Sequence, residues 1–313
     1  MIIEIKTIII TIITSFIFQY ISQVIFLKYN LIDKINKRSS HINIATRSGG
    51  ISVFSVIFLI SLYYYLVGLE IYDFSFIVPL SLLLTIGLYD DIYKMDFKLK
   101  FIFQIIAAKI MIDNGLIIDN LHGFLGINEL NRFIAQIITI LIILAIINSI
   151  NFIDGIDGLA SSIIVMFILL FEFLSNSITP FFNLSLITIS SLIPLFYFNF
   201  RKQKKVFLGD AGSLFLGGLA STYIIFILTN DYIIKPQYDL HKLLFVIIIF
   251  LYPIIDITRV TLMRIYTGKS PFIADKNHIH HLLIKKVGNN HFTATLLILL
   301  ICSIVVFITF LIF

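Results

Sequence analysis

Apolar runs long enough to cross a membrane follow one another along almost the whole chain. A transmembrane helix needs about 20 predominantly apolar residues to cross the roughly 30 Å hydrocarbon core of a bilayer. Hydrophobic residues make up 59% of the 313 residues and charged residues only 13%. A mean hydropathy of +1.02 excludes a soluble globular domain. We therefore predict an all-α polytopic membrane protein that forms one integral membrane domain over residues 1–313.

The runs predict about ten transmembrane helices, the first of which is longer than a signal-peptide core and is expected to be retained. They lie near residues 7–27, 49–69, 74–89, 101–113, 133–148, 159–174, 181–198, 211–229, 243–262 and 293–313. Of the 23 Lys and Arg residues, 18 fall in or beside the odd-numbered connections. Because cytoplasmic loops are enriched in basic residues, we expect these connections in the cytoplasm and both termini outside it. Residues 115–126 predict a small extracytoplasmic hairpin that turns at Asp119-Asn120.

The segment Asn148–Ser162, NSINFIDGIDGLASS, interrupts the apolar sequence with two aspartates and two glycines. On a helix or a tight turn, Asp154 and Asp157 would point the same way, because they are three residues apart. A carboxylate at membrane depth costs roughly 2.5–3.5 kcal/mol, so two of them favour a bound cation or a water-filled cavity. Gly155 and Gly158 would let the backbone approach a ligand closely. A polar loop tip between two helices is the alternative.

Three more aspartates stand at the ends of predicted helices. Asp90 and Asp91 are adjacent, and adjacent carboxylates raise one another's pKa unless a cation or a basic partner compensates. Asp210, in GDAGS, stands where a helix begins, a position that suits a capping residue as well as a metal ligand. The alternatives are a solvated helix end for the pair and simple capping for Asp210.

The last predicted cytoplasmic connection, Ser270–Lys286, contains three histidines within four residues. His278 and His281 would share a helical face, with His280 beside them. Imidazole groups can donate hydrogen bonds to phosphate oxygens or bind metals. A single surface histidine would carry little meaning, but this group is predicted on the same side of the membrane as the acidic residues.

All these groups are expected on one face of the membrane, and the acidic ones are hard oxygen donors. With no thiolate beside them, this set favours Mg²⁺, or Mn²⁺, over softer metals. Magnesium with carboxylates and basic side chains is the usual equipment for phosphoryl transfer. A membrane-surface site of this kind predicts a substrate shared between water and lipid, and no nucleic-acid partner.

In its motifs the chain resembles the polyprenyl-phosphate N-acetylhexosamine-1-phosphate transferases, bacterial membrane enzymes also grouped as glycosyltransferase family 4. The similarity runs from about Asp33 to Leu283, and the motifs that carry it are RSSH with a following GG, the Asp90-Asp91 pair with Gln104, NFIDGIDGLA, GDAGSLFLG, and PIIDITRVTLMR leading to GKSPFIADKNHIHH. One segment departs from the pattern: Ile44, Ala45 and Thr46 stand where many relatives have Pro-Thr-Pro.

The resemblance implies transfer of an N-acetylhexosamine-1-phosphate, with GlcNAc-1-phosphate as the best single choice, from a UDP-sugar to undecaprenyl phosphate with release of UMP. The HIHH form resembles the branch that starts O-antigen of lipopolysaccharide, enterobacterial common antigen or teichoic acid chains in cell wall biogenesis. It also implies an inner-membrane enzyme with a cytoplasmic active-site cleft and a Mg²⁺ cofactor. The oligomeric state stays open, with a homodimer as one expectation.

The family pattern also implies roles for individual residues. The metal ligands would be Asp210 and Asp154. The catalytic group would consist of Asp90, Asp91, Asp154, Asp157, His278, His280 and His281. Substrate would be bound by Asn151, Arg38, Lys100 and Arg264, although basic residues at these places also follow from membrane topology alone.

Two other functions are compatible with parts of the sequence. An intramembrane aspartyl protease would use Asp90 and Asp210, but Phe207 stands where its first motif glycine belongs, and neither the central aspartates nor the histidines are explained. An ion-coupled transporter would bind ions to acidic residues in broken helices. Asp256, three residues before Arg259, fits that alternative as well as it fits a buried ion pair.

Overall fold

The computed structural model describes residues 5–33, 44–69, 71, 73–124, 126–229, 232–235, 241–268, 277–288 and 290–312. It confirms an all-α membrane protein. Within these residues, seven helices are long and apolar enough to cross a membrane, or eight if one bent pair counts as a single span. A helix or helix pair occupies each of the ten predicted runs, but α4 and α6 are shorter, with 17 and 16 residues. The number of ten crossings therefore stays a prediction.

Two helices in the first half of the chain, α3 and α5, continue beyond the apolar runs that predicted them. The third predicted run ended at residue 89 and the fifth at 148, whereas their helices end at Tyr93 and Ile153. The additional turns carry polar residues that find partners inside the protein. The elements are α1 (Ile5–Lys28), β1 (Ala45–Thr46), α2 (Gly49–Leu66), η1 (Phe74–Phe76), α3 (Ile77–Tyr93), α4 (Phe97–Asp113), β2 (Asn120–Phe124), β3 (Ile127–Glu129) and α5 (Arg132–Ile153).

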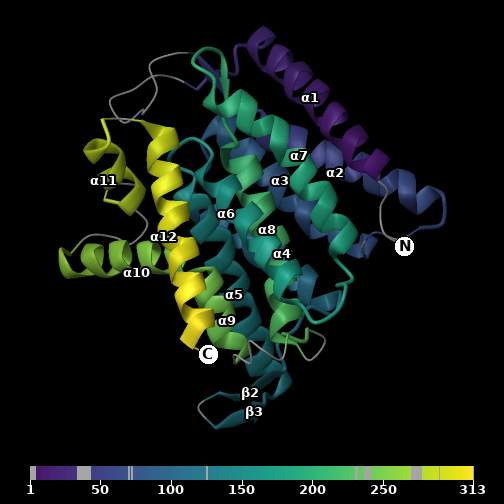
Figure 1. The fold of residues 1–313 in the computed structure, drawn as a ribbon, viewed down its shortest axis with the longest axis vertical. Helices are drawn as coiled ribbons and strands as arrows, with labels where there is room; N and C mark the ends of the chain where they lie inside the picture. Colours follow the sequence, from purple (N-terminus) through teal and green to yellow (C-terminus); the bar gives the residue numbers. More distant parts are fainter. Residues whose placement is uncertain are drawn as a thin grey trace.

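In the second half, one short helix projects away from the bundle. The helices α9 and α10 meet at a bend of 77°, and α10 points sideways out of the body in Figure 1. The elements are α6 (Leu159–Leu174), α7 (Phe182–Phe200), β4 (Lys205–Val206), α8 (Gly209–Leu228), α9 (Lys242–Ile249), α10 (Leu251–Tyr266), α11 (Ile279–Lys286) and α12 (His291–Ile312).

Helix α8 is the centre of the bundle. It lies in the middle of Figure 1 and is buried along almost its whole length, packed against α2, α3 and α5. Close approach of these helices depends on glycine. A Cβ on Gly87 of α3 would meet the carbonyl oxygen of Asp210, and one on Gly50 of α2 would meet the backbone of Gly212. The start of α8 is therefore held tightly against the end of α3.

Helix α1 packs on α2 and α7 through a polar stripe. Every fourth residue on this face is polar and buried: Thr7, Thr11, Ser15, Gln19 and Gln23. Some of these side chains donate to groups far along the chain, as Ser15 does to the carbonyl of Ser191 and Gln23 to that of Lys204, whereas Thr11 donates to the carbonyl of Thr7 within α1. Hydrogen bonds of this kind replace water for polar groups inside a bundle.

Two small β-pairs join loops at the ends of the helices. The strands β1 and β4 are parallel, with Ala45 opposite Lys205 and Thr46 opposite Val206. The segment that departs from the family pattern is thus paired, through β1, with the strand that directly precedes α8. The strands β2 and β3 confirm the predicted hairpin, but Phe124 pairs with Ile127, so the turn lies there and not at Asp119-Asn120. Glycine at 123 and 126, both with positive φ, allows the chain to reverse at this later point.

Candidate active site

The two adjacent aspartates at the end of α3 have separate partners. Asp91 is almost fully buried, and its carboxylate accepts hydrogen bonds from the backbone N–H of Ala211 at 3.0 Å and from Arg47 at 3.1 Å. Asp90 accepts from the ammonium group of Lys100 at 2.9 Å and from the backbone N–H of Met95 at 2.7 Å. Each carboxylate of the adjacent pair therefore has its own basic partner, which offsets the repulsion expected between the two charges.

Asp210 lies in the first turn of α8 and faces this pair. Its Oδ2 is 2.6 Å from Lys100 Nζ, and its Oδ1 accepts from Asn151 Nδ2 at 3.3 Å. The same amide of Asn151 donates to Ser213 at 2.8 Å. Asp210 does not act as the cap residue of α8: the acceptor near that helix end is Asp91, from a different helix. Capping therefore does not account for Asp210.

Asp154 lies in the turn between α5 and α6 and completes the group. Its side chain is half-buried. Burial, followed by the charges of Asp210 and Asp91, raises the pKa of Asp154 well above its usual range. Burial is the larger cause, and the charges of Asp210 and Asp91 add to it, so Asp154 lies near these two residues. A cation placed there would stabilise its ionised form.

Asp157 does not face this cluster. Its carboxylate pairs with Lys205 and, across 3.3 Å, with His291. The expectation that Asp154 and Asp157 point the same way is wrong, because the chain between them is neither a helix nor a uniform turn. Helix α5 has ended at Ile153 and α6 begins only at Leu159, so residues 154–157 form a turn that does not follow the helical period.

The glycines of this turn serve contacts within the protein. A Cβ on Gly155 would meet the imidazole rings of His280 and His281, and one on Gly158 would lie 2.5 Å from the Phe200 ring. The sequence suggested that these glycines admit a ligand to the backbone. In the structure, Gly155 leaves room for the histidine segment and Gly158 leaves room for a side chain of α7.

The three histidines have different environments. His278 Nδ1 is 2.8 Å from Asp256 Oδ2, and its ring stacks with that of His280. His280 is fully buried with Nδ1 3.2 Å from the Tyr252 hydroxyl, and its Nε2 has no hydrogen-bond partner. Burial, with the charge of His281, lowers the pKa of His280 to about 3, so its ring is neutral. His281 is half-exposed and is the histidine best placed to reach a substrate.

Two residues of the site were not predicted from the sequence. Arg47 joins Asp91 to Asp33, and although burial opposes its charge, the two carboxylates raise the pKa of Arg47. The glycine pair that follows RSSH stands in the sequence RSGG, which begins with Arg47, and this motif was the sequence signal for Arg47. Asp256 accepts from His278 and from the backbone N–H of Ile279 at 2.7 Å. It also pairs with Arg259 at 3.3 Å. Asp256 thus positions the histidine segment, a role no spacing in the sequence indicated.

The remaining predicted basic residues divide into three cases. Lys100 stands at the centre of the site, between Asp90 and Asp210. Arg264 is buried in α10, with 4% of its surface exposed. Arg38 lies outside the described residues.

The donor atoms of the cluster are all oxygen, which suits Mg²⁺ and Mn²⁺. In the part of the chain that the structure describes, two positive charges, from Lys100 and Arg47, face the four carboxylates of Asp90, Asp91, Asp154 and Asp210. No group of three His, Cys, Asp or Glu side chains among the described residues is arranged to hold a metal unaided. The residues present fit a cation that takes further oxygen ligands from a bound phosphate.

Comparison with known proteins relates this arrangement to a family. A family model described as glycosyl transferase family 4 matches residues 73–228, which include the α3, α5 and α8 parts of the cluster. A Bacillus subtilis (strain 168) protein named probable undecaprenyl-phosphate N-acetylglucosaminyl 1-phosphate transferase is 31% identical over 304 residues, covering 94% of this chain and 80% of the relative.

Other similar proteins come from distant bacteria. A Pasteurella multocida (strain Pm70) protein named undecaprenyl-phosphate alpha-N-acetylglucosaminyl 1-phosphate transferase is 36% identical over 274 residues, covering 82% of this chain and 72% of the relative. A decaprenyl-phosphate N-acetylglucosaminephosphotransferase of Mycolicibacterium smegmatis (strain ATCC 700084 / mc(2)155) is 27% identical over 310 residues, covering 91% and 76%. These similarities extend over nearly the whole bundle, and the chain belongs to glycosyl transferase family 4, the family of polyprenyl-phosphate N-acetylhexosamine-1-phosphate transferases.

Proposed function

We propose that this protein transfers N-acetylglucosamine-1-phosphate from UDP-N-acetylglucosamine to undecaprenyl phosphate, releasing UMP. The observation that carries the proposal is the convergence of Asp90 and Asp210 on Lys100, with Asp91 bound to Arg47 and Asp154 nearby, beside the histidine segment. Carboxylates with a lysine and imidazoles suit a reaction between two phosphate groups. The relatives that match most of this chain are named for such a transfer.

The reaction forms a bond between a phosphate oxygen of the lipid and the sugar-linked phosphorus of the donor, and breaks the bond from that phosphorus to UMP. A phosphate monoester has a second pKa near 6, so the lipid phosphate is mostly dianionic at neutral pH. The nucleophile therefore needs positioning more than deprotonation. Asp90 is the group we assign to orienting the lipid phosphate or accepting a residual proton, because Asp91 is committed to Arg47 and Ala211.

We also propose a Mg²⁺ site at Asp210 and Asp154, with Mn²⁺ as a substitute. The surplus of negative charge there and the all-oxygen donor set support it. When bound, the ion would offset charge on the donor diphosphate. The chain's own contributions are positional: Asn151 orients the carboxylate of Asp210, and Lys100 supplies a mobile ammonium group beside it.

His281 completes the proposed donor site. It is half-exposed and packed with its ring centroid 4.3 Å from that of the buried His280. His278 and His280 are engaged with Asp256 and Tyr252. We assign substrate contact to His281 because its side chain is partly exposed, whereas His278 and His280 are buried, and we assign support of its position to the other two histidines.

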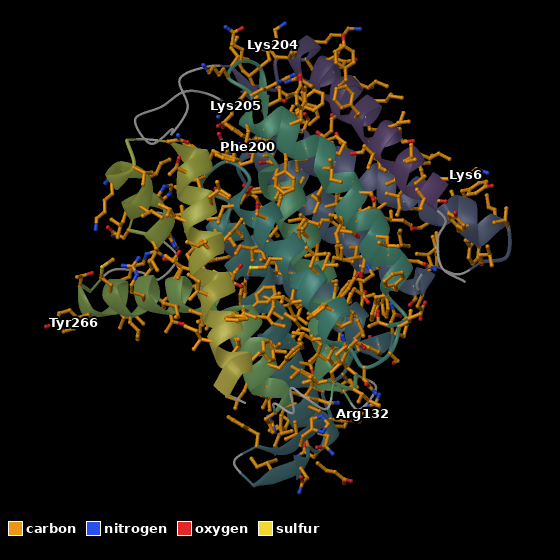
Figure 2. The ribbon with its side chains drawn as sticks, in the orientation of Figure 1. Lys6, Arg132, Phe200, Lys204, Lys205 and Tyr266 are labelled. Carbon is orange, nitrogen blue, oxygen red and sulfur yellow. The ribbon has the colours of Figure 1, made fainter. Side chains whose placement is uncertain are left out.

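The orientation in the membrane follows the same proposal. Lys204 and Lys205 lie at one end of the molecule and Arg132 toward the end that carries the β2–β3 hairpin (Figure 2). We place the end with Lys204 and Lys205 on the cytoplasmic side of the bacterial inner membrane, because UDP-sugars are made in the cytoplasm. The excess of basic residues in these connections supports that placement.

The two alternatives explain the arrangement less well. An aspartyl protease dyad would use Asp90 and Asp210, but it gives no role to Lys100, which binds both carboxylates, or to the Asp154 turn and the histidine segment. A transporter site is expected near the membrane midplane, but Asp91 lies in the last turn of α3 and Asp210 in the first turn of α8.

A direct assay tests the proposal. Purified protein in nanodiscs is incubated with undecaprenyl phosphate, Mg²⁺ and, in turn, UDP-linked GlcNAc, GalNAc and N-acetylfucosamine, and lipid products are identified by mass. We expect undecaprenyl-diphosphate-GlcNAc and UMP in equal amounts, with no product after addition of EDTA. A folded protein that forms no lipid-linked sugar from any of these donors would refute the function, and transfer that persists in EDTA would refute the metal.

A further inference from the structure

Asp157 belongs to a closed network outside the carboxylate cluster. It is 5% exposed, and its carboxylate pairs with Lys205 Nζ and with His291 Nδ1 at 3.3 Å. Its backbone is held as well: the carbonyl accepts from Thr295 at 3.0 Å, and the N–H lies 3.1 Å from the same His291 Nδ1, which accepts from this N–H when it is unprotonated and donates to the carboxylate when it is protonated. Burial opposes ionisation, but His291 and Lys205 lower the pKa of Asp157, so the group is a carboxylate at neutral pH. Every one of these partners belongs to the protein.

Lys205 connects this network to the start of α8. It is the first residue of β4, which is paired with β1. The next residues continue the connection, since Phe207 N–H donates to the carbonyl of Thr46 at 2.8 Å and its carbonyl accepts from Gly49 at 2.9 Å. Asp210 follows in the first turn of α8. The ammonium group that binds Asp157 is therefore carried on a strand with little freedom to move relative to Asp210.

The other end of the network is the turn that carries Asp154. This turn is confined on both sides, by the His280 and His281 rings against Gly155 and by Phe200 against Gly158. Asp157 is the point at which the turn is tied to β4 and to α12. The distance between Asp154 and Asp210 thus depends on a series of contacts that connects the turn to β4. The ion pair of Asp157 with Lys205 is the electrostatic contact in this series.

We propose that Asp157 is a positioning residue that, through Lys205, sets the place of the Asp154 turn relative to Asp210 without touching substrate. The inference rests on the proposed function only because that function assigns the carboxylates of Asp154 and Asp210 to the donor diphosphate. Displacement of a binding group by about 1 Å can cost on the order of a hundredfold in rate. A link remote from the reacting atoms can therefore have a large effect on activity.

A double-mutant cycle tests this assignment. The variants are Asp157→Asn, Lys205→Met and the combination of both, with Lys204→Met as the control, because Lys204 is the exposed neighbour (Figure 2). The kcat and the KM for each substrate are measured in nanodiscs. We expect each single variant to lose about tenfold in kcat/KM for the nucleotide sugar, mainly through KM, with KM for the lipid unchanged. The control should match wild type.

The double variant gives the decisive comparison. Removing one partner leaves the other as an unpaired buried charge, and removing both does not. We therefore expect the double variant to be no less active than the less active of the two single variants. If the two residues acted independently, their losses in kcat/KM would multiply to about a hundredfold loss. Complete inactivity of Asp157→Asn beside near-normal Lys205→Met would overturn the proposal in favour of a direct catalytic role.

Two further measurements distinguish positioning from a simple loss of folded protein. If the variants only lower the folded fraction, kcat falls in step with thermal stability and both KM values stay constant; that result rejects positioning. The unfolding temperatures of the same four proteins and wild type test the ion pair without any substrate, and strictly additive losses would reject it. Failure of wild type to transfer any sugar phosphate would refute the proposed function and leave this stability cycle as the test of the link.

Discussion

Lys100 and Asp210 are joined by an ion pair of 2.6 Å between Nζ and Oδ2, although each lies in the first turn of a different helix. The same ammonium group is 2.9 Å from Asp90. One positive charge therefore holds together two carboxylates that come from the end of α3 and the start of α8. The arrangement leaves the site short of positive charge among the described residues, a condition suited to binding a further cation.

Replacing Lys100 by Met should remove most transfer activity. Breaking a buried ion pair by removing one partner costs about 3–5 kcal/mol, and Lys100 has only 14% of its side chain exposed. We expect kcat/KM to fall by at least about a hundredfold, with a smaller loss for Lys100→Arg. Lys98→Met is the matched control, because Lys98 is exposed on the same helix. Similar rates for the two methionine variants would contradict a central role for Lys100.

Asp210→Asn should abolish transfer while the protein stays folded. The amide keeps the shape of the side chain and its contact with Asn151 but removes the negative charge that faces Lys100. Turnover is measured on protein that elutes as one peak in size-exclusion chromatography. Asp113→Asn makes the same chemical change at an exposed ion pair and should be neutral. Near-normal turnover of a monodisperse Asp210→Asn protein would reject its assignment as metal ligand.

Asp256→Asn should lower activity by about tenfold, through the histidine segment. It weakens the hydrogen bonds from His278 and from the backbone N–H of Ile279, and hydrogen bonds to a charged group are each worth roughly 1.5–3 kcal/mol. Initial rates at saturating lipid acceptor measure the loss. The exposed Lys285, on α11 itself, offers a control in Lys285→Met. Unchanged rates in Asp256→Asn would mean that the histidines hold their places without it.

Stability should fall as the solution is made acidic, in part because of His280. Burial and the charge of His281 lower its pKa to about 3, against about 6.5 in an unfolded chain. Between these values the unfolded chain binds a proton that the folded protein does not, so the free energy of unfolding decreases as pH is lowered through this window. We expect the unfolding temperature to drop from pH 7 to pH 5, and to drop less steeply in His280→Gln. Parallel pH curves for the two proteins would contradict a neutral buried imidazole.

Gly87→Ala should reduce both the yield of folded protein and its activity. The added Cβ would lie 2.5 Å from the N and Cα atoms of Ala211, which are backbone atoms that cannot rotate away. Overpacking of this kind costs typically 1–3 kcal/mol, and here it would push α3 away from the start of α8. Thr85→Ala, at an exposed position of the same helix, is the comparison. Wild-type activity and unfolding temperature in Gly87→Ala would show that the two helices can separate without consequence.

The sequence predicted the helices well, for physical reasons that are local. Long apolar runs can satisfy their backbone only as helices in a bilayer, so the elements lie where the runs do. Asp90, Asp154 and Asp210 all fell in connections predicted on one face of the membrane, and the structure brings their segments together.

What could not be predicted depends on the direction of single side chains. Spacing of three residues placed Asp154 and Asp157 together, but α5 ends before Asp154 and the residues between the two aspartates form an irregular turn. Arg47 and Asp256 act through partners that lie 44 and 22 residues away. Pairings at such distances are decided by how the helices pack, which no periodicity in one sequence encodes.

The polar stripe of α1 has a consequence for how the protein is made. Gln23 donates to the carbonyl of Lys204, a residue 181 positions later. At a translation rate of about 5–20 residues per second, the ribosome needs roughly 10–40 s to reach that partner. During this interval Gln23 lacks that partner, so α1 can pack against α2 at once but can dock onto α7 only when the later half of the chain has arrived.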